Sequence, residues 1–415
     1  MGFQQGLSGL NAASKNLDVI GHNIANSGTV GFKASRTEFD EMVASAIGSA
    51  NGTNGGIGVS VGAIAQQFTQ GNISVTGNNL DVAINGNGFF QIQQNDGTMA
   101  YTRAGNFKLD KAGNVITNAG GKVMGYPVDP ATGKPTAGSP RPLVFPTGAP
   151  IPAKQTANAK VTFNLDARAV EAATATPPTP RATYGTSITV YDSQGVPNTV
   201  SLYFEKTANP NEWNVYNQLD DPNATPPVVA TPVGTITFDG NGKITSGSTL
   251  TLNIATAPAN PNSPTPGPTF PVEFDFSDST QYGTKWAVSE STQDGYTAGQ
   301  LTGINIGTDG TILTRYSNGV TRPEGVGSLA TFRNTQGLAD IGNNLWVEPY
   351  ESGQPTVGQP TNGAFGQLRS GALEDSNVDL TAELVNMMTA QRAYQANAQT
   401  IKTQDQIMST LVNLR

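Results

Sequence analysis

The chain has 415 residues, a formal net charge of −8 and no cysteine. The negative charge argues against nucleic acid or an anionic membrane surface as a partner, and the lack of cysteine excludes a disulfide framework and thiol chemistry. Charged residues make up only 13% of the chain, which is typical of large surfaces that must meet copies of themselves without repulsion.

The positions of proline show where long helices are allowed. All 27 prolines lie between Pro127 and Pro360. Because proline breaks helix interiors, we predict long helices only before Pro127 and after Pro360.

The first helix is predicted in residues 1–34. Its apolar residues repeat at alternating spacings of three and four, which indicates a heptad seam formed by Leu7, Leu10, Leu17 and Ile24, with Ser14 and Gly21 between them. Gly28 and Gly31 then end the helix. The first residues lack a basic stretch followed by an apolar one, so we do not expect a cleaved secretory signal. No apolar run reaches the length that crosses a bilayer, and we expect no membrane insertion.

Between the two ends, the pattern changes to strands and turns. Residues 35–70 form a connector rich in Gly, Ser and Asn. The alternating runs 80–84 and 89–93, with Asn-Gly turns around them, predict β-hairpins. The same pattern of strands and turns continues through 101–126 and resumes after Trp286.

A separate unit is predicted at residues 146–285, because Pro-rich segments bound it and it has strands of its own. An antiparallel barrel or sandwich fits this pattern. The predicted strands are Val161–Leu165, Ser187–Tyr191, Thr199–Phe204, Thr235–Phe238, Leu250–Ile254 and Val272–Phe276.

The second helix is predicted from Leu380 to Arg415. Its seam keeps the spacing of the first and consists of Leu380, Leu384, Met387, Gln391, Tyr394, Ala398, Ile401, Asp405, Met408 and Val412. Ser376 with Asp379 fits a capping box at its start.

Together these elements predict a multidomain α+β fold, with terminal α-helical coiled-coil arms and nested, mainly antiparallel β domains. The predicted divisions are residues 1–34 and 376–415 as a helical terminal domain and polymer core, 35–70 as a connector, 71–145 and 286–375 as a core β domain, and 146–285 as an inserted outer β domain.

Motifs for catalysis, cofactors or metals are weak in this chain. His22 is the one histidine, and without cysteine or nearby acidic ligands it favours a helix-packing or surface role. Residues 86–88 begin like a dinucleotide fingerprint but lack the third glycine, so a hairpin turn is favoured. Residues 239–243 resemble a calcium loop only faintly, and a β-turn is favoured. We therefore predict no catalytic, cofactor-binding or metal-binding residues and no enzymatic activity.

The helical seams are the candidate functional residues. An amphipathic helix usually packs on the core of its own domain, so a helix pair within one chain remains an alternative. Because the ends contain little besides the seam, the pattern favours packing between chains. The predicted self-assembly interface is Leu7, Leu10, Leu17, Ile24, Leu380, Leu384, Met387, Tyr394, Ile401, Met408 and Val412.

Both ends also resemble a known family. The segment SGLNAASKNLDVIGHNIANSGTVGFKAS at 8–35 is similar to the N-terminal signature of flagellar rod, hook and hook-associated proteins. The segment from Ser370 to Leu414 resembles their C-terminal signature. LDVAINGNGFFQI at 80–92, YTRAGNFKLDKAG at 101–113 and residues 289–319 resemble the core β domain of hook subunits. The rod members are much shorter, and the insert at 146–285 therefore favours the hook.

This resemblance implies a structural subunit of the bacterial flagellar hook, which self-assembles into a curved tubular universal joint that transmits motor torque. It implies a homo-polymer that meets the distal rod protein, the hook cap protein and the hook-filament junction protein. It also implies export by the flagellar type III apparatus and an extracellular location in the basal body and hook of the flagellum. Two alternatives remain: a distal rod or other axial subunit, and a secreted β-rich adhesin or carbohydrate-active protein.

Overall fold

The computed structural model describes residues 2–43, 56–129, 132–136, 138–145, 150–174, 179–221, 229–256 and 268–413. The chain divides into two compact units. Unit 1 consists of Met1–Gly148, Thr302–Arg315 and Thr321–Arg415, and unit 2 consists of Ala149–Leu301 and Tyr316–Val320. The second unit is thus an insertion into the first.

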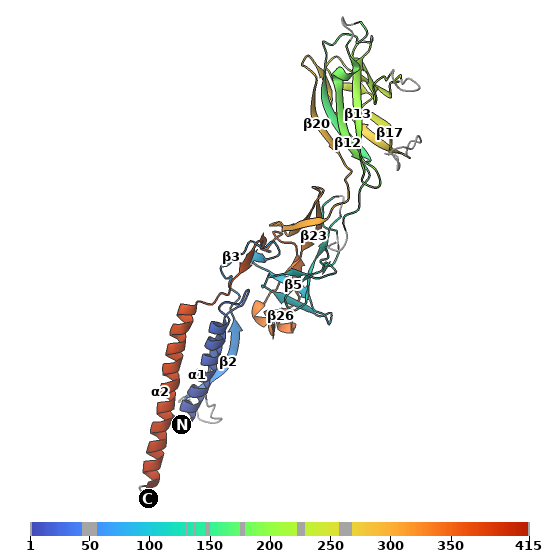
Figure 1. Cartoon of the computed structure of the whole chain (residues 1–415). Helices are drawn as coiled ribbons and strands as arrows, with labels where there is room; N and C mark the ends of the chain where they lie inside the picture. Colours follow the sequence, from blue (N-terminus) through green and yellow to red (C-terminus); the bar gives the residue numbers. More distant parts are fainter. Residues whose placement is uncertain are drawn as a thin grey trace. The chain divides into compact units, whose positions relative to one another are not determined.

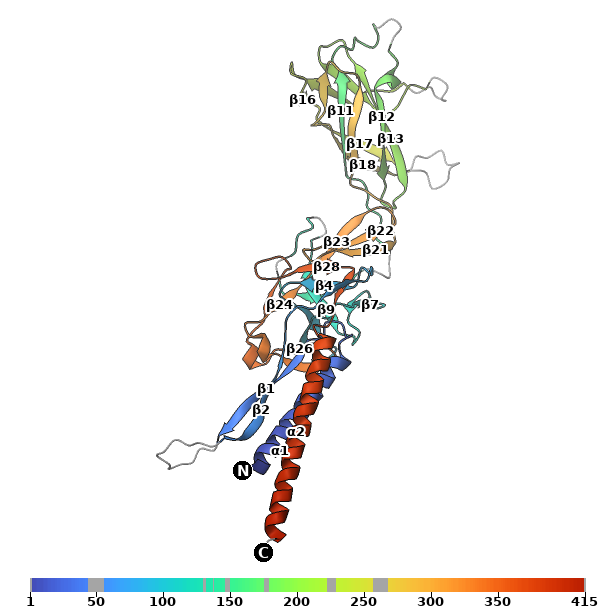
Figure 2. The same cartoon turned by 90° about the vertical axis from the view of Figure 1, so that its left-hand side faces the viewer.

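Two long helices lie side by side in unit 1 and run in opposite directions (Figures 1 and 2): α1 spans Gly2–Ala25 and α2 spans Leu380–Asn413. Both fall where proline is absent, as predicted. Among the described residues, no helix is long and apolar enough to cross a membrane.

Asp379 caps the start of α2. Its Oδ1 accepts hydrogen bonds from the backbone N–H groups of Thr381 and Ala382 at 2.9 and 3.1 Å. The predicted capping box is therefore wrong in register: Asp379 is the cap itself, and Ser376 lies one turn earlier, where its hydroxyl accepts from Val378 N. A carboxylate at this position also offsets the positive end of the helix dipole.

The segment 35–70 contains an antiparallel hairpin of β1 (Ser35–Val43) and β2 (Gly56–Gln66), which the sequence pattern did not predict. The hairpin lies beside α1 in Figure 2. Ser8 of α1 accepts a hydrogen bond from Val59 N on its hydroxyl. One side of α1 is therefore covered by β2 and another by α2.

The β core of unit 1 is one large, mainly antiparallel sheet with two short ladders. Its main path is β21 (Leu301–Ile306), β22 (Thr311–Tyr316), β23 (Thr321–Gly327), β9 (Lys122–Pro127), β5 (Phe89–Gln93), β6 (Met99–Thr102), β26 (Leu345–Val347) and β25 (Ala339–Gly342). Attached to this path are β7 (Lys108–Leu109), β8 (Val115–Ile116), β10 (Arg141–Pro142), β24 (Leu329–Thr331) and β27 (Thr356–Gly358). The ladders pair β4 (Val82–Asn85) with β28 (Gln367–Ser370), and β3 (Ile73–Val75) with β29 (Ala372–Glu374).

The two ladders join sequence-distant parts of the chain and correct one prediction. The runs at 80–84 and 89–93 do not form a hairpin with each other, because β4 pairs with β28 while β5 pairs with β6, β9 and β24. The glycines at 86 and 88 instead carry the chain from one sheet to the next. An aromatic cluster of Phe89, Tyr101 and Trp346 fills the core nearby, with edge-to-face contacts to Phe68 and Phe332.

Unit 2 is a sandwich of two sheets around one apolar core. One sheet contains β17 (Thr249–Ala255), β18 (Thr269–Asp275), β11 (Asn158–Asp166), β19 (Thr280–Tyr282) and β20 (Ala287–Gln293). The other contains β12 (Gly185–Tyr191), β13 (Pro197–Lys206), β14 (Glu212–Tyr216), β15 (Gly234–Phe238) and β16 (Ile244–Ser246). Short 3₁₀ turns lie at Arg181–Tyr184 in this unit and at Thr335–Gly337 and Tyr350–Ser352 in unit 1.

Side chains from both sheets of unit 2 meet in its core, including Phe163 and Phe276 from one and Phe204 and Trp213 from the other. The six strands predicted here are confirmed within a few residues, because each alternates between buried and exposed positions. The turn at 239–243 is confirmed too: β15 and β16 pair across it, and Asp239 Oδ1 accepts from Asn241 N and Lys243 N.

The predicted fold class is confirmed in its coarse form: one helix lies at each end of the chain, and the segment between them forms several mainly antiparallel sheets. The coiled-coil character of the arms is not established by these helices, which pair within one chain, and it remains a prediction.

Candidate assembly site at the helical ends and their junction with the β core

Small residues let the two helices approach closely. A Cβ atom added to Gly6 of α1 would lie 3.0 Å from Ile401 Cγ1 of α2, and one added to Gly9 would lie 2.9 Å from the side chain of Asn397. On α1 the buried positions include Ala12, Val19 and Ile20. The face that α1 buries within its own chain is therefore formed by glycine, alanine and two β-branched residues.

The predicted seam of α1 borders that face and is only partly buried. Leu7 is 44% exposed, and Leu10, Leu17 and Ile24 are half-buried. On α2, Leu380, Leu384, Tyr394 and Met408 are exposed, while Met387 and Ile401 are half-buried. The side chain of Val412 is outside the described residues. Of the predicted set, Ile401 lies directly against α1, beside Gly6.

Further apolar side chains lie exposed along the same helices. Phe3 on α1 and Val385, Met388 and Ile407 on α2 are each about half exposed. The two helices thus carry an exposed apolar surface, which we call the arm surface and define by Phe3, Leu7, Leu380, Leu384, Val385, Met388, Tyr394, Ile407 and Met408.

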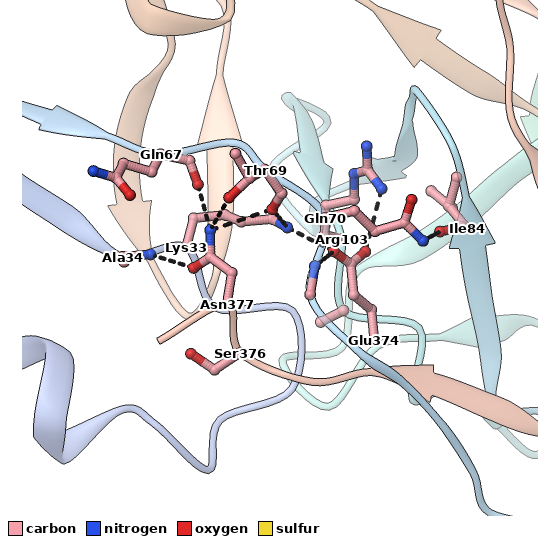
Figure 3. Close-up of polar contacts among 12 residues, drawn as sticks. Lys33, Ala34, Gln67, Thr69, Gln70, Ile84, Arg103, Glu374, Ser376 and Asn377 are labelled. Atoms are coloured by element: carbon pink, nitrogen blue, oxygen red, sulfur yellow. Dashed lines mark hydrogen bonds and ion pairs between the residues drawn. The ribbon is translucent and has the colours of Figure 1, made fainter. Parts of the chain in front are cut away.

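Where the helices meet the β core, a buried ion pair joins both ends of the chain (Figure 3). Lys33 Nζ lies 2.6 Å from Glu374 Oε1, and neither side chain is exposed to solvent. Lys33 also donates to the backbone oxygen of Thr69 at 2.7 Å. The same Glu374 oxygen accepts from Gly71 N at 2.9 Å. The carboxylate of Glu374 therefore joins three segments of the chain, 31–35, 67–72 and 374–377.

Two more side chains complete this cluster, which we call the clasp and define by Lys33, Arg103, Glu374 and Asn377. Arg103 Nη1 donates to Glu374 Oε2 at 3.2 Å, and its Nη2 donates to Gly86 O at 2.9 Å. Asn377 Oδ1 accepts from Ala34 N at 2.7 Å. Its Nδ2 donates to Gln67 O and Thr69 Oγ1.

The clasp places one carboxylate between two buried cations. Burial lowers the pKa of Lys33, Glu374 counteracts that effect, and Arg103 lowers the pKa further. Burial likewise lowers the pKa of Arg103, and Glu374 opposes it. A buried ion pair adds little net stability when intact, but removing one partner leaves an uncompensated charge. The clasp therefore stabilises one specific arrangement of the chain ends on the β core.

Gly31 allows this close approach. Its φ is +71°, and a Cβ atom there would lie 2.5 Å from Ala104 N. Gly31 N also donates to the backbone oxygen of Glu374 at 2.8 Å. Only glycine fits both the left-handed conformation and the contact.

His22 is exposed and stands edge-on to Phe32, with a centroid distance of 5.4 Å. Among the residues that the structure describes, no group of three or more His, Cys, Asp or Glu residues could hold a metal ion. The clasp binds chain segments to one another.

The clasp leaves no pattern in the sequence. Each of its residues lies within a segment that carried the family resemblance, but no pattern linked them. A single charged residue inside a short apolar stretch, as in Phe32-Lys33-Ala34, is the signal that could have indicated a buried ion pair.

Comparison with known proteins defines the class to which this fold belongs. Four family models of flagellar rod and hook proteins match successive parts of the chain. They are "Flagella basal body rod protein" at 3–33, "Flagellar hook protein FlgE/F/G D1 domain" at 83–167, "Flagellar basal body protein FlaE D2 domain" at 164–296 and "Flagellar basal body rod FlgEFG protein C-terminal" at 369–414.

Relatives identify the family within that class. The flagellar hook protein FlgE of Salmonella typhimurium is 43% identical over the full length of both chains, and that of Escherichia coli K12 is 44% identical over 432 aligned residues. FlgE of Borreliella burgdorferi is 33% identical over 99% of this chain and 98% of its own. The chain belongs to the flagellar hook protein FlgE family, and the prediction of a structural hook subunit is confirmed.

A solved structure supports the fold alone. The crystal structure of Helicobacter pylori flagellar hook protein FlgE2 aligns with 72% of this chain and all of its own, with a TM-score of 0.53 and 16% identity.

Proposed function

We propose that this hook subunit self-assembles into a curved tube, a universal joint that passes motor torque to the filament, and that the arm surface forms the contacts between subunits. The observation that carries the proposal is the exposure of large apolar side chains along both helices, such as Leu384 at 47% and Met388 at 52%. Large apolar side chains exposed at many positions along two paired helices, with Leu384, Val385 and Met388 close together in sequence, favour an interaction site.

The low charge of the helices favours packing between copies. On α1, Lys15 lies 3.8 Å from Asp18, so the charges of that helix offset each other. A head-to-tail contact between identical subunits that does not close into a ring generates an open helix. Residues 1–34 and 376–415 would form the inner layer of such a polymer, and the predicted seams, including Leu10, Leu17, Ile24, Met387, Ile401 and Val412, would contribute to its contacts.

The remaining parts of the chain would form the outer layers. The predicted core domain at 71–145 and 286–375 would form the middle layer, and the predicted insert at 146–285, together with β20, which pairs with β11, would form the outermost one. Residues 35–70 would connect these layers to the helices. Torque carried by the helices must pass into the β core at their junction. The clasp fits that role because three chain segments, which contain Lys33, Gly71 and Arg103, converge on Glu374 and Asn377 through buried or partly buried hydrogen bonds.

The same proposal assigns location and partners. The subunit would reach the extracellular hook through the flagellar type III export apparatus without a cleaved signal peptide. It would contact the distal rod protein, the hook cap protein and the hook-filament junction protein besides its own copies. Its role would be structural and not enzymatic, with no cofactor.

Purified protein tests this function directly. Concentrated full-length chain should form tubes that electron microscopy detects and that sediment in the ultracentrifuge, without added ligand. A protein that stays monomeric at every concentration tested would contradict self-assembly.

A further inference from the structure

A polar pocket lies between α1, α2 and the start of β1. Its volume is about 220 Å³, and its lining includes Asn23 from α1, Thr37 from β1, and Glu383 and Asn386 from α2. Two buried oxygen atoms in this lining, Glu383 Oε2 and Thr37 Oγ1, have no hydrogen-bond partner within the described part of the chain. Thr37 as a whole is only 8% exposed.

The carboxylate of Glu383 is held in place from one side only. Asn23, which is 1% exposed, accepts from Ser35 N at 2.9 Å and donates to Ser35 O at 2.8 Å. The same Asn23 amide donates to Glu383 Oε1 at 3.4 Å. The second oxygen of Glu383 therefore remains available to the pocket.

No cation of this pocket satisfies that oxygen. Arg36 is the one cationic residue in the described lining, and its guanidinium is bound to Glu38 on the exposed strand. A buried acceptor without a partner costs free energy, and a buried carboxylate favours a charge-assisted donor. The pocket thus has the chemistry to accept a guanidinium or ammonium group from outside the chain.

We propose that the Glu383 pocket receives the guanidinium of Arg392 from a second copy of this chain, an inference that rests on the proposed self-assembly. Arg392 is exposed on α2, and none of the ion pairs among the described residues includes it. It follows Glu383 by nine residues, which is about two and a half helical turns, so the two side chains leave opposite faces of α2.

This placement gives each subunit one pocket on the inner face of α2 and one cation on the outer face. A contact of that kind joins different surfaces of identical chains and repeats from copy to copy, as a helical polymer requires. The pair would add a directional polar contact to the apolar arm surface and fix the register between neighbouring α2 helices.

A double-mutant cycle on full-length protein tests the pair. Glu383→Gln and Arg392→Gln should each raise the critical concentration for polymerisation by about tenfold or more. Because both remove one interaction, the double variant should be no worse than either single variant. Lys402→Gln, at an exposed position of the same helix outside the predicted seam, is the matched control and should polymerise like the unmodified chain. Urea unfolding of the dilute monomers should show that all variants fold.

Each other outcome overturns a specific claim. Additive effects of the two substitutions would exclude a direct pair. If Arg36→Gln reproduced the defect of Glu383→Gln, and Arg392→Gln did not, the cation would come from within the chain. Unchanged polymerisation of both single variants would overturn the Glu383 pocket and leave self-assembly intact. Failure of the unmodified chain to polymerise would instead contradict the proposed function.

Discussion

Lys33 and Glu374 stand 341 positions apart in the chain, yet their side chains meet at 2.6 Å and neither is exposed. Lys33 follows α1 and Glu374 precedes α2, so the pair holds the ends of both helices that face the β core. Segments that begin and end the described chain are thereby joined through a single buried carboxylate.

Neutralising that carboxylate should destabilise unit 1. In Glu374→Gln, Lys33 and Arg103 would remain buried without a counter-ion, and we expect the free energy of unfolding to fall by about 3–5 kcal/mol. Urea unfolding followed by tryptophan fluorescence measures it, because Trp346 lies in the core of unit 1. Glu38→Gln, which removes a solvent-exposed pair with Arg36, is the control, with an expected loss of about 0–1 kcal/mol. Equal losses in both variants would show that the clasp has no special role.

The backbone beside the clasp makes a second prediction. Gly31→Ala would combine a strained positive φ with a clash against Ala104 N, and we expect a loss of about 1–3 kcal/mol. Gly28→Ala is the matched control, since a Cβ atom there meets nothing within 4 Å. Thermal unfolding of the two variants compares them. If both melt like the unmodified protein, the close approach at Gly31 is not required.

The arm surface makes a third prediction. Leu384→Asp introduces a charge at a 47% exposed position of α2, so the monomer should fold normally. Polymerisation should fail, because assembly would bury that charge in an apolar contact. Val229→Asp is the control: it introduces the same charge in place of an apolar side chain at a 78% exposed position of unit 2 and should still polymerise. Sedimentation and circular dichroism separate assembly from folding. Tubes of normal yield from Leu384→Asp would remove this residue from the interface.

The inserted unit makes a fourth prediction. Replacing residues 149–301 by a short flexible linker should leave unit 1 folded, because the units have separate apolar cores. The deletion extends past residue 285 because β20 pairs with β11 and belongs to the sandwich. The shortened subunit should form tubes that are straighter than those of the full chain, since outer contacts between neighbours would be lost. Electron micrographs decide it, and equal curvature would mean that the inner layers set the shape.

The sequence predicted what local patterns encode. Both helices follow from proline-free ends with heptad spacing, and the strands around Phe163 and Val272 follow from strict alternation. The strand β20 was missed because almost all of its residues are exposed, which removes the alternating signal. The hairpin β1–β2 was missed because β1 is mostly polar and charged and β2 contains three glycines.

The parts of the candidate site that could not be predicted from the sequence are those formed by residues far apart in the chain. The inner face of α1 carries Ala12 and Ala13, whose small size gives no apolar signal comparable to the leucines of the seam. The clasp joins positions near both ends, and no spacing rule connects Lys33 with Glu374. Such contacts become visible only when the β core has brought the two ends together.

One measurement tests the central claim most directly: an electron cryomicroscopy map of the polymer formed by the purified full-length chain. We expect α1 and α2 of every subunit to line the innermost layer, with Leu384 and Met388 buried against a neighbouring copy and the Lys33–Glu374 pair intact. A polymer in which these helices lie on the outside, or in which the arm surface remains exposed to solvent, would contradict the account.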